Sequence, residues 1–247
     1  ALAVACHPWR ELISRRGVVL LYMPDKVDDA EILLPDERGL VVGRLFCGAD
    51  AHAYRRVGKE DMGCSTIEQW CADGAAEFSR THWGDYLLIL HDRGHDKLLV
   101  MRNPMGTHAV YHTDLEGGRV HLIFSHADDY VTLCERADVD EDYLRGFIAR
   151  PRLVSARTAL KDVRELLPGQ SLVLGRESRV LKTAWRPARP QRYSASAFAW
   201  HAQHLQKQAL AATRAWVGDG ERILHQLSGG FDSSVVLALL RASAPKA

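Results

Sequence analysis

Two different spacings of apolar residues divide the chain. Up to about residue 185 the apolar runs are short and are separated by turn-forming residues, which is typical of strands. Residues 86–90 and 97–101 flank one polar turn, and residues 110–112 and 120–124 flank another. Both pairs have the pattern of a β-hairpin. Because hairpins place neighbouring strands in opposite directions, this part of the chain predicts an antiparallel sheet.

Two further strands and one helix belong to the same part. Residues 17–22 and 39–46 are apolar runs that begin at a glycine, and both predict strands. Residues 140–149 have helical spacing, with Asp140 as the expected N-cap and Pro151 as the residue that ends the helix. We expect the apolar stripe of this helix to cover a sheet. The stripe consists of Tyr143, Leu144, Phe147 and Ile148.

The pattern changes after residues 185–192, which are rich in proline and arginine and predict a domain boundary. Helical spacing then begins at Ser196, the expected cap, and ends at Gly218. Residues 222–227 predict a strand, and residues 234–242 predict a second helix. A strand between two helices indicates the start of an α/β sheet.

The composition is that of a globular protein with balanced charge. The chain has 247 residues, of which 47% are hydrophobic, and this length favours two packed units. Thirty-two basic residues face thirty-one acidic ones, so the basic excess that a nucleic-acid partner demands is missing. No apolar run approaches the roughly 18 residues of a membrane span, and residues 1–5 are too short for a signal peptide. We therefore expect a cytoplasmic protein.

The cysteines indicate neither a disulfide framework nor a metal site. Their number is odd and their spacing shows no pairs, which fits a reducing compartment. Zinc at Cys64, Cys71 and His82 is disfavoured, because six residues separate the two cysteines. The five cysteines are Cys6, Cys47, Cys64, Cys71 and Cys134.

The most informative segment is the loop that joins the predicted strand to the last predicted helix. Its sequence is Leu227-Ser228-Gly229-Gly230-Phe231-Asp232-Ser233. A glycine loop that enters a helix presents backbone N–H groups at the positive end of the helix dipole, where a phosphate group fits.

The polar side chains of this loop add to the same prediction. Ser228 and Ser233 supply hydroxyl donors, and Asp232 predicts a Mg²⁺ ion between its carboxylate and the phosphate. The loop is not a Walker motif, because no lysine follows its glycines in the required frame. A glycine turn that only joins a strand to a helix is the structural alternative.

This loop resembles the pyrophosphate loop of the asparagine synthetase family, Ser-Gly-Gly-x-Asp-Ser. Three upstream segments are similar to motifs of that family and occur in the same order. Residues 83–92 resemble its Gly-Asp-Phe-Ala strand, and residues 102–111 its Arg-Asp-Pro-x-Gly turn with a following tyrosine. Residues 160–169 resemble its Leu-x-Pro-Gly turn. The resemblance implies an ATP-dependent, AMP-forming amide ligase that binds ATP at residues 227–233 and Mg²⁺ at Asp232.

The resemblance also implies a fold with two domains. Residues 1–187 would form a degenerate glutamine amidotransferase-like domain, an α+β sandwich of the Ntn type with α/β/β/α layers. Residues 188–247 would begin an α/β PP-loop synthetase domain of the asparagine-synthetase type. The acid–base residues of the ligase reaction are then expected beyond Ala247.

The first domain departs from a working glutaminase, which in this family uses an N-terminal cysteine whose own amine is the base. Residue 1 is Ala1, and the nearest thiol, Cys6, follows five other residues. The family's Asn-Gly-Glu segment, which holds glutamine, does not occur in the sequence, and Asn103 stands where the family turn has aspartate. We expect a first domain that does not hydrolyse glutamine.

Among relatives without glutaminase activity, the chain is most similar to lasso peptide macrolactam cyclases, on residues 39–46 and 222–228. This resemblance implies adenylation of an Asp or Glu side chain of a precursor peptide, followed by attack of the peptide's N-terminal amine. The partners implied are the precursor peptide, a leader peptidase and a leader-recognition protein.

Two alternatives stay open at this point. An asparagine synthetase or a β-lactam synthetase would use ATP in the same way and differ only in the acceptor. A non-catalytic scaffold that binds a peptide would need no nucleotide. Retention of both loop serines and of Asp232 favours the enzyme.

Overall fold

The computed structural model describes residues 10–15, 17–22, 31–34, 38–50, 53–58, 61–62, 64–134, 137–151, 154–176, 178–189, 197–218 and 222–243. Ala1, Cys6, the expected helix cap Ser196 and Ala247 lie outside these residues.

The chain divides into two compact units. The first unit consists of Ala1–Leu45 and Gly58–Arg186, and the second of Phe46–Val57 and Pro187–Ala247. The sequence pattern gave no sign that residues 46–57 belong with the C-terminal part.

The larger sheet has seven strands, in the order β12-β11-β7-β6-β4-β3, with β5 paired to β4. β6 pairs antiparallel with β7, and β11 pairs antiparallel with both β7 and β12. The predicted antiparallel hairpin is confirmed as β6 and β7, and the predicted strand at 39–46 is confirmed as a longer β4. The strands are β3 (Glu31–Leu33), β4 (Gly39–Asp50), β5 (Ala53–Arg56), β6 (His82–Asp92), β7 (Lys97–Arg102), β11 (Gln170–Leu174) and β12 (Arg179–Thr183).

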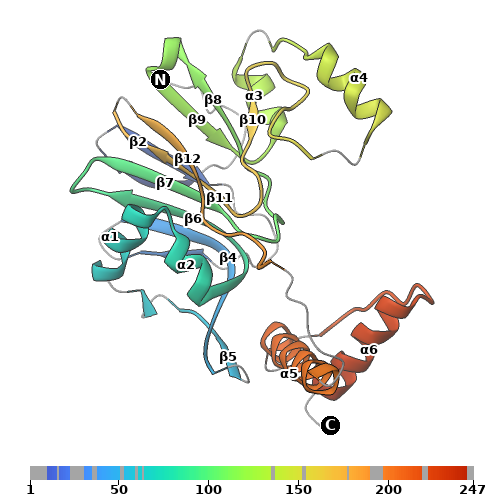
Figure 1. Ribbon diagram of the computed structural model, residues 1–247. Helices are drawn as coiled ribbons and strands as arrows, with labels where there is room; N and C mark the ends of the chain where they lie inside the picture. Colours follow the sequence, from blue (N-terminus) through green and yellow to red (C-terminus); the bar gives the residue numbers. More distant parts are fainter. Residues whose placement is uncertain are drawn as a thin grey trace. The chain divides into compact units, whose positions relative to one another are not determined.

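Helices α1 (Cys64–Asp73) and α2 (Ala76–Thr81) cover one face of this sheet (Figure 1). Side chains alternate along β6, so Tyr86, Leu88 and Leu90 share the face toward the helices. Aromatic rings form the contact: Phe78 of α2 lies 5.4 Å from the ring of Tyr86 and 4.9 Å from the ring of Trp70 of α1. Burial of each such side chain stabilises the fold by about 1.5–3 kcal/mol.

The opposite face of the larger sheet packs on a second, three-stranded sheet, with the order β10-β8-β9. This sheet contains β8 (Tyr111–Leu115), which a short 3-10 turn at Glu116–Gly118 joins to β9 (Val120–Phe124), and β10 (Arg164–Glu165). The β8–β9 pair confirms the second predicted hairpin. A cluster of apolar residues lies between the sheets: Val100, Val110, Leu166, Leu172 and Leu174, with Leu87, Ile89, Leu98 and Ile123 packed against it.

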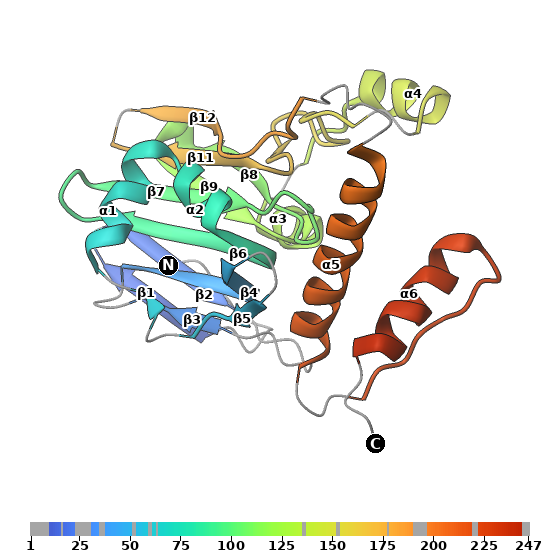
Figure 2. The ribbon, with the colours of Figure 1, turned by 60° about the horizontal axis from the view of Figure 1, so that its bottom comes forward.

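The short helix α3 (Ala127–Leu133) packs on the outer face of the smaller sheet (Figure 2). Ile123 of β9 points to the apolar cluster, so the next residue, Phe124, points to the other face. Tyr130 of α3 stacks on Phe124 with ring centroids 5.5 Å apart. The first unit is therefore a mixed α+β fold with helices outside two antiparallel sheets.

A separate two-stranded sheet consists of β1 (Arg10–Arg15) and β2 (Val18–Tyr22), and it confirms the strand predicted at residues 17–22.

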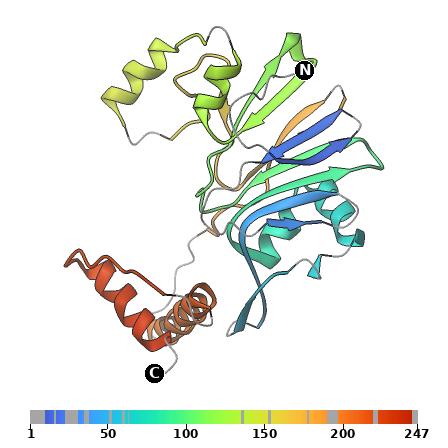
Figure 3. The same cartoon turned by 180° about the vertical axis from the view of Figure 1, so that it is seen from behind.

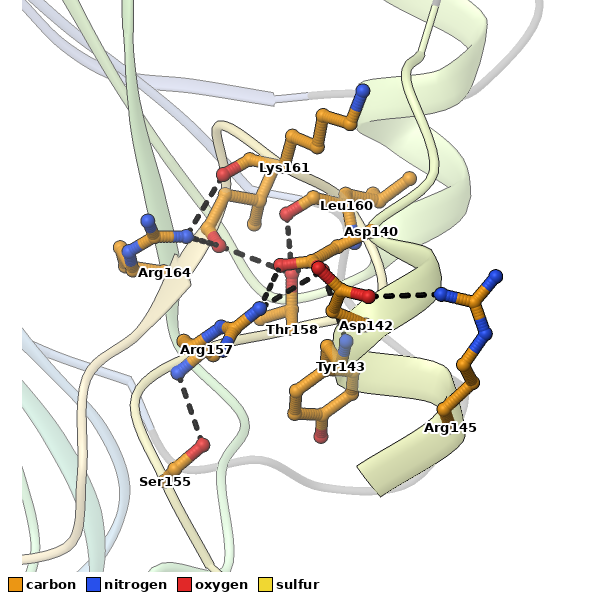
Figure 4. A network of polar contacts seen from close by, with 11 residues as sticks. Asp140, Asp142, Tyr143, Arg145, Ser155, Arg157, Thr158, Leu160, Lys161 and Arg164 are labelled. Atoms are coloured by element: carbon orange, nitrogen blue, oxygen red, sulfur yellow. Dashed lines mark hydrogen bonds and ion pairs between the residues drawn. The ribbon is translucent and has the colours of Figure 1, made fainter. Parts of the chain in front are cut away.

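Helix α4 (Glu141–Ala149) begins as predicted but does not cover a sheet (Figure 3). Asp140 caps it by accepting a hydrogen bond from the backbone N–H of Tyr143, at 2.9 Å, and Arg157 binds the same carboxylate at 2.7 Å (Figure 4). The expected packing of its apolar stripe is wrong, since Phe147 is 45% exposed and Ile148 is 78% exposed. Helical spacing shows which residues share a face, but not whether a sheet meets that face.

The second unit contains α5 (Phe198–Val217) and α6 (Phe231–Ser243), which pack against each other (Figure 2). Both predicted helices are confirmed, and α5 ends at Gly218 as expected. The end of β4 joins this unit through Phe46, whose ring lies 5.1 Å from that of Trp216 on α5. Tyr54 of β5 also donates a hydrogen bond to Gln208 of α5.

The strand predicted at residues 222–227 is wrong, because no regular structure is found there. Its apolar residues are exposed: Ile223 by 48%, Leu227 by 55%, and Leu224 fully. A strand exists only when its backbone N–H and C=O groups pair with a neighbouring strand. None of the described strands pairs with this segment, so the apolar pattern is present without the structure that it favours.

Candidate functional sites in the two units

The motif residues form two candidate functional sites, one in each unit. In the first unit, the turn that follows β7 is built around Arg102, which is 6% exposed. Its guanidinium donates to Glu165 at 2.6 Å, to the backbone oxygen of Leu166 at 2.7 Å and to that of Gly106 at 2.8 Å. Arg102 therefore connects its own turn to the segment at β10.

The two family-like turns of the first unit meet at Gly106. The residue has φ +68°, and a Cβ there would lie 2.6 Å from the Cγ of Pro168. Only glycine fits both the left-handed backbone and this close approach. The backbone N–H of Gly169 completes the contact by donating to the carbonyl of Arg102 at 3.2 Å. The sequence placed these turns in one family but could not show that they touch.

Asn103 is fully buried beside this arginine and organises a polar network. Its amide nitrogen donates to the backbone oxygen of Gly84 at 3.2 Å and to the hydroxyl of Thr107 at 3.0 Å, and it lies 3.5 Å from Asp85. Its side-chain oxygen accepts from the N–H of Gly106 at 2.6 Å.

The carboxylate of Asp85 also accepts a hydrogen bond from Thr107 and lies 3.0 Å from Nε2 of His108. The side chains of Asn103, Thr107 and Asp85 are hydrogen-bonded to one another, so the network holds the turn after β7 against β6. The sequence indicated Asp85 only as part of a strand motif, and it did not predict the contacts of Asp85 with Thr107 and His108.

The thiol of Cys71 does not supply a nucleophile in the first unit. Burial, and then the charge of Asp92, raise the pKa of the Cys71 thiol to about 12. Cys71 is therefore a protonated core residue at neutral pH.

A third cluster of polar side chains connects the two sheets. Arg179 of β12 donates to Asp114 at 2.7 Å and to Nδ1 of His112 at 2.9 Å. Asp114 also binds His121 at 2.6 Å. Burial, and then the charge of Arg179, lower the pKa of His112 to about 4, so its ring is neutral and accepts from the guanidinium.

In the second unit, the loop before α6 closes on itself through its serines. Gly230 N–H donates to Oγ of Ser228 at 3.4 Å, and the two serine oxygens, of Ser228 and Ser233, lie 3.0 Å apart. The hydroxyl of Ser233 donates back to the carbonyl of Gly230 at 3.1 Å and accepts from Ser228 N–H at 3.3 Å. These bonds form a ring of donors and acceptors within the loop.

The donors of this loop fit a phosphate group. Gly229 has φ +78°, and residues 228–232 are exposed. The first N–H groups of a helix lack an intrahelical acceptor, and here they belong to the start of α6. Serine hydroxyls rotate freely, so both can turn from the loop toward an anion. Asp232 lies in the first turn of α6, where its oxygens are of the type that Mg²⁺ prefers. The structure thus brings Ser228, Ser233 and the glycines together.

The described residues contain no group of three or more His, Cys, Asp or Glu side chains arranged to hold a metal ion. None of the helices in the described ranges combines the length and apolarity that a bilayer-spanning helix needs.

Comparison with known proteins identifies the class of the first unit. Residues 63–185 match the sequence model of a family described as a glutamine amidotransferase domain. The segment includes both hairpins, the Arg102 turn and the β11–β12 pair. The chain therefore contains an amidotransferase-like domain. No curated protein matches the chain.

Proposed function

We propose that the protein is an ATP-dependent, AMP-forming amide ligase that closes a macrolactam in a peptide, in the manner of a lasso peptide cyclase. The observation that carries this proposal is the loop at residues 228–233, whose two serines, two glycines and aspartate stand together at the start of α6. The amidotransferase-like domain at residues 63–185 supports the proposal, because the asparagine synthetase family, which the chain resembles, has such a domain before its synthetase domain.

The proposed reaction has two steps. In the first, a carboxylate oxygen of a peptide Asp or Glu attacks the α-phosphorus of ATP, which forms an acyl-adenylate and releases pyrophosphate. In the second, the peptide's N-terminal amine attacks the acyl carbon, the amide bond forms, and AMP leaves as the amine gives up a proton. Holding both groups in one bound peptide makes the second step effectively unimolecular.

The residues of this chain would act in the first step. The N–H groups at the start of α6 and the hydroxyls of Ser228 and Ser233 would bind the pyrophosphate part of ATP. Asp232 would hold Mg²⁺, which supplies charge neutralisation at the phosphates when it is bound. In this proposal a precursor peptide is the substrate, and a leader peptidase and a leader-recognition protein act with the enzyme.

The family match favours a second candidate, a ligase that uses ammonia, as an asparagine synthetase does. The matched family is described as a glutamine amidotransferase domain, and in the asparagine synthetase family, which the chain resembles, a working domain of this kind supplies ammonia from glutamine. Against this candidate, the sequence contains no Asn-Gly-Glu segment, and Asn103 is its single asparagine.

The test is product analysis with the full-length protein, a leader-free precursor peptide, ATP and Mg²⁺. The proposal predicts a product one water lighter, AMP in equal amount, and an N-terminal amine that no longer reacts with amine reagents. A peptide whose acceptor carboxylate is replaced by an amide is the matched control and should stay linear. Asparagine formation from aspartate and ammonia, with no dehydrated peptide, would replace this proposal with the second candidate.

A further inference from the structure

The segment before the glycine loop contains one residue that is less exposed than its neighbours. Among residues 222–232, all of which are described, His225 alone is not exposed. Its Nε2 lies 2.9 Å from the backbone oxygen of Ser233, in the first turn of α6. A carbonyl oxygen only accepts, so Nε2 carries the proton and donates.

This hydrogen bond links a residue before the glycine loop to the last residue of the loop. It joins residues eight positions apart, with residues 228–230 between them. Ser233 is therefore held at two places: its carbonyl by His225, and its hydroxyl by the ring with Ser228 and Gly230.

The bond to the carbonyl of Ser233 and the bonds of its hydroxyl respond differently to a bound anion. A phosphate group repels the carbonyl of Gly230 and attracts hydroxyl donors, so Ser228 and Ser233 must leave the ring in order to bind it. The bond from His225 uses neither hydroxyl. It can stay in place while the ring opens.

From this geometry we infer that His225 is a positioning residue for the phosphate loop. Its hydrogen bond keeps Ser233 and the start of α6 in place when the serine hydroxyls turn toward pyrophosphate. The inference rests on the proposed function of the loop. The sequence offered no signal for it, because the histidine stands three residues before the motif and in a segment that predicted a strand.

The test measures binding of inorganic pyrophosphate with Mg²⁺ to the full-length protein by titration calorimetry. His225→Leu removes the donor and should weaken binding roughly two- to tenfold, the range for one hydrogen bond. His225→Gln should bind nearly as well as the wild type, because its amide nitrogen stands the same number of bonds from Cα. The exposed neighbour provides the control: Gln226→Leu should bind like the wild type, and all variants should unfold at the same urea concentration.

The outcomes separate this inference from the proposed function. If the wild type binds no pyrophosphate, both the proposed function and the role of His225 are overturned. If the wild type binds and His225→Leu binds equally well, only the role of His225 is overturned. If His225→Gln is as weak as His225→Leu, donation to Ser233 is not the cause.

Discussion

The hairpin β6–β7 and the segment before α6 have similar apolar sequences but different structures. In the hairpin, Tyr86, Leu88 and Leu90 are fully buried, because α1, α2 and a paired strand surround them. In the other segment, Ile223, Leu224 and Leu227 are exposed. The comparison shows that an apolar run specifies a tendency, and that a pairing partner decides whether a strand forms.

The two motif turns differ in the same way. In the turn at Arg102–Gly106, the side chains of Arg102 and Asn103 are buried. Both bind the backbone of Gly106, and Arg102 also binds Glu165 of β10. Residues 228–232 of the second loop are exposed, and the hydroxyls of Ser228 and Ser233 bind atoms of the loop itself. The first turn therefore acts on stability, while the second remains available to a ligand. Variants in the first turn should change the free energy of unfolding, and variants in the second should change ligand binding.

The largest effect on stability is expected for Arg102→Met. The change leaves Glu165 and the carbonyls of Leu166 and Gly106 without their charged donor in a buried place. The free energy of unfolding should fall by about 3–5 kcal/mol in urea titrations. Arg145→Met is the control, because the pairs of Arg145 on α4 are exposed and contribute little. Equal losses in both variants would contradict the buried role of Arg102.

Asn103→Asp should destabilise the first unit by about 2 kcal/mol at pH 7.5. The introduced carboxylate cannot donate to Gly84 or Thr107, and it stands beside the carboxylate of Asp85. A neighbouring negative charge raises the pKa of a carboxyl group, and the protonated form can donate. The deficit in the free energy of unfolding relative to the wild type should therefore become smaller as the pH falls from 7.5 to 5.

Asn103→Ala is the control for this pH dependence. It removes the same amide hydrogen bonds without adding a titratable group, so its deficit relative to the wild type should be the same at both pH values. A deficit of Asn103→Asp that does not vary with pH would show that Asp85 and residue 103 do not interact.

Acid should weaken the contact between the two sheets through His112. Its folded pKa of about 4 lies below the ordinary value of 6.5, so the neutral ring contributes full stability above pH 6.5 and loses it as the pH falls toward 4. The loss should be about 1–3 kcal/mol. Unfolding curves at pH 7.5, 6.5, 5.5 and 4.5 would measure it. The same curves for His112→Gln should be flatter, and identical slopes would exclude His112 as the cause.

The smallest effect is expected for Tyr86→Phe. The hydroxyl of Tyr86 is buried and finds no hydrogen-bond partner among the described residues, and burial raises its pKa. Removal of an unpaired buried hydroxyl should leave stability unchanged or raise it by up to about 1 kcal/mol. Urea titration beside the wild type tests this. A clear loss of stability would show that the hydroxyl is paired in solution.

The sequence predicted the hairpins, the cap of α4 and both C-terminal helices, because their signals are local. Alternation, a capping aspartate and a terminal glycine act within a few residues. It failed for residues 222–227 and for the exposed face of α4, because both predictions depended on a partner element that local spacing does not contain. For the same reason it could not foresee the joining of Phe46 to Trp216.

The two candidate sites also differ in whether their residues are close together in the sequence. The residues of the glycine loop are contiguous, so the sequence could name all of them. The contacts of Arg102 with Glu165, and of Asp85 with Thr107 and His108, join strands and turns that are distant along the chain. Only the fold brings them together. Whether the loop binds ATP stays a prediction.

The most direct measurement for the proposed ligase is exchange of labelled pyrophosphate into ATP, because formation of an acyl-adenylate is reversible. With the full-length protein, exchange should require the peptide substrate, and Asp232→Asn should reduce it roughly a hundredfold through loss of a metal contact. Asp142→Asn, an exposed change on α4 far along the chain from the loop, should leave it unaltered. Exchange that is absent with every acyl substrate, or unchanged in Asp232→Asn, would contradict the assignment of the loop at residues 228–233.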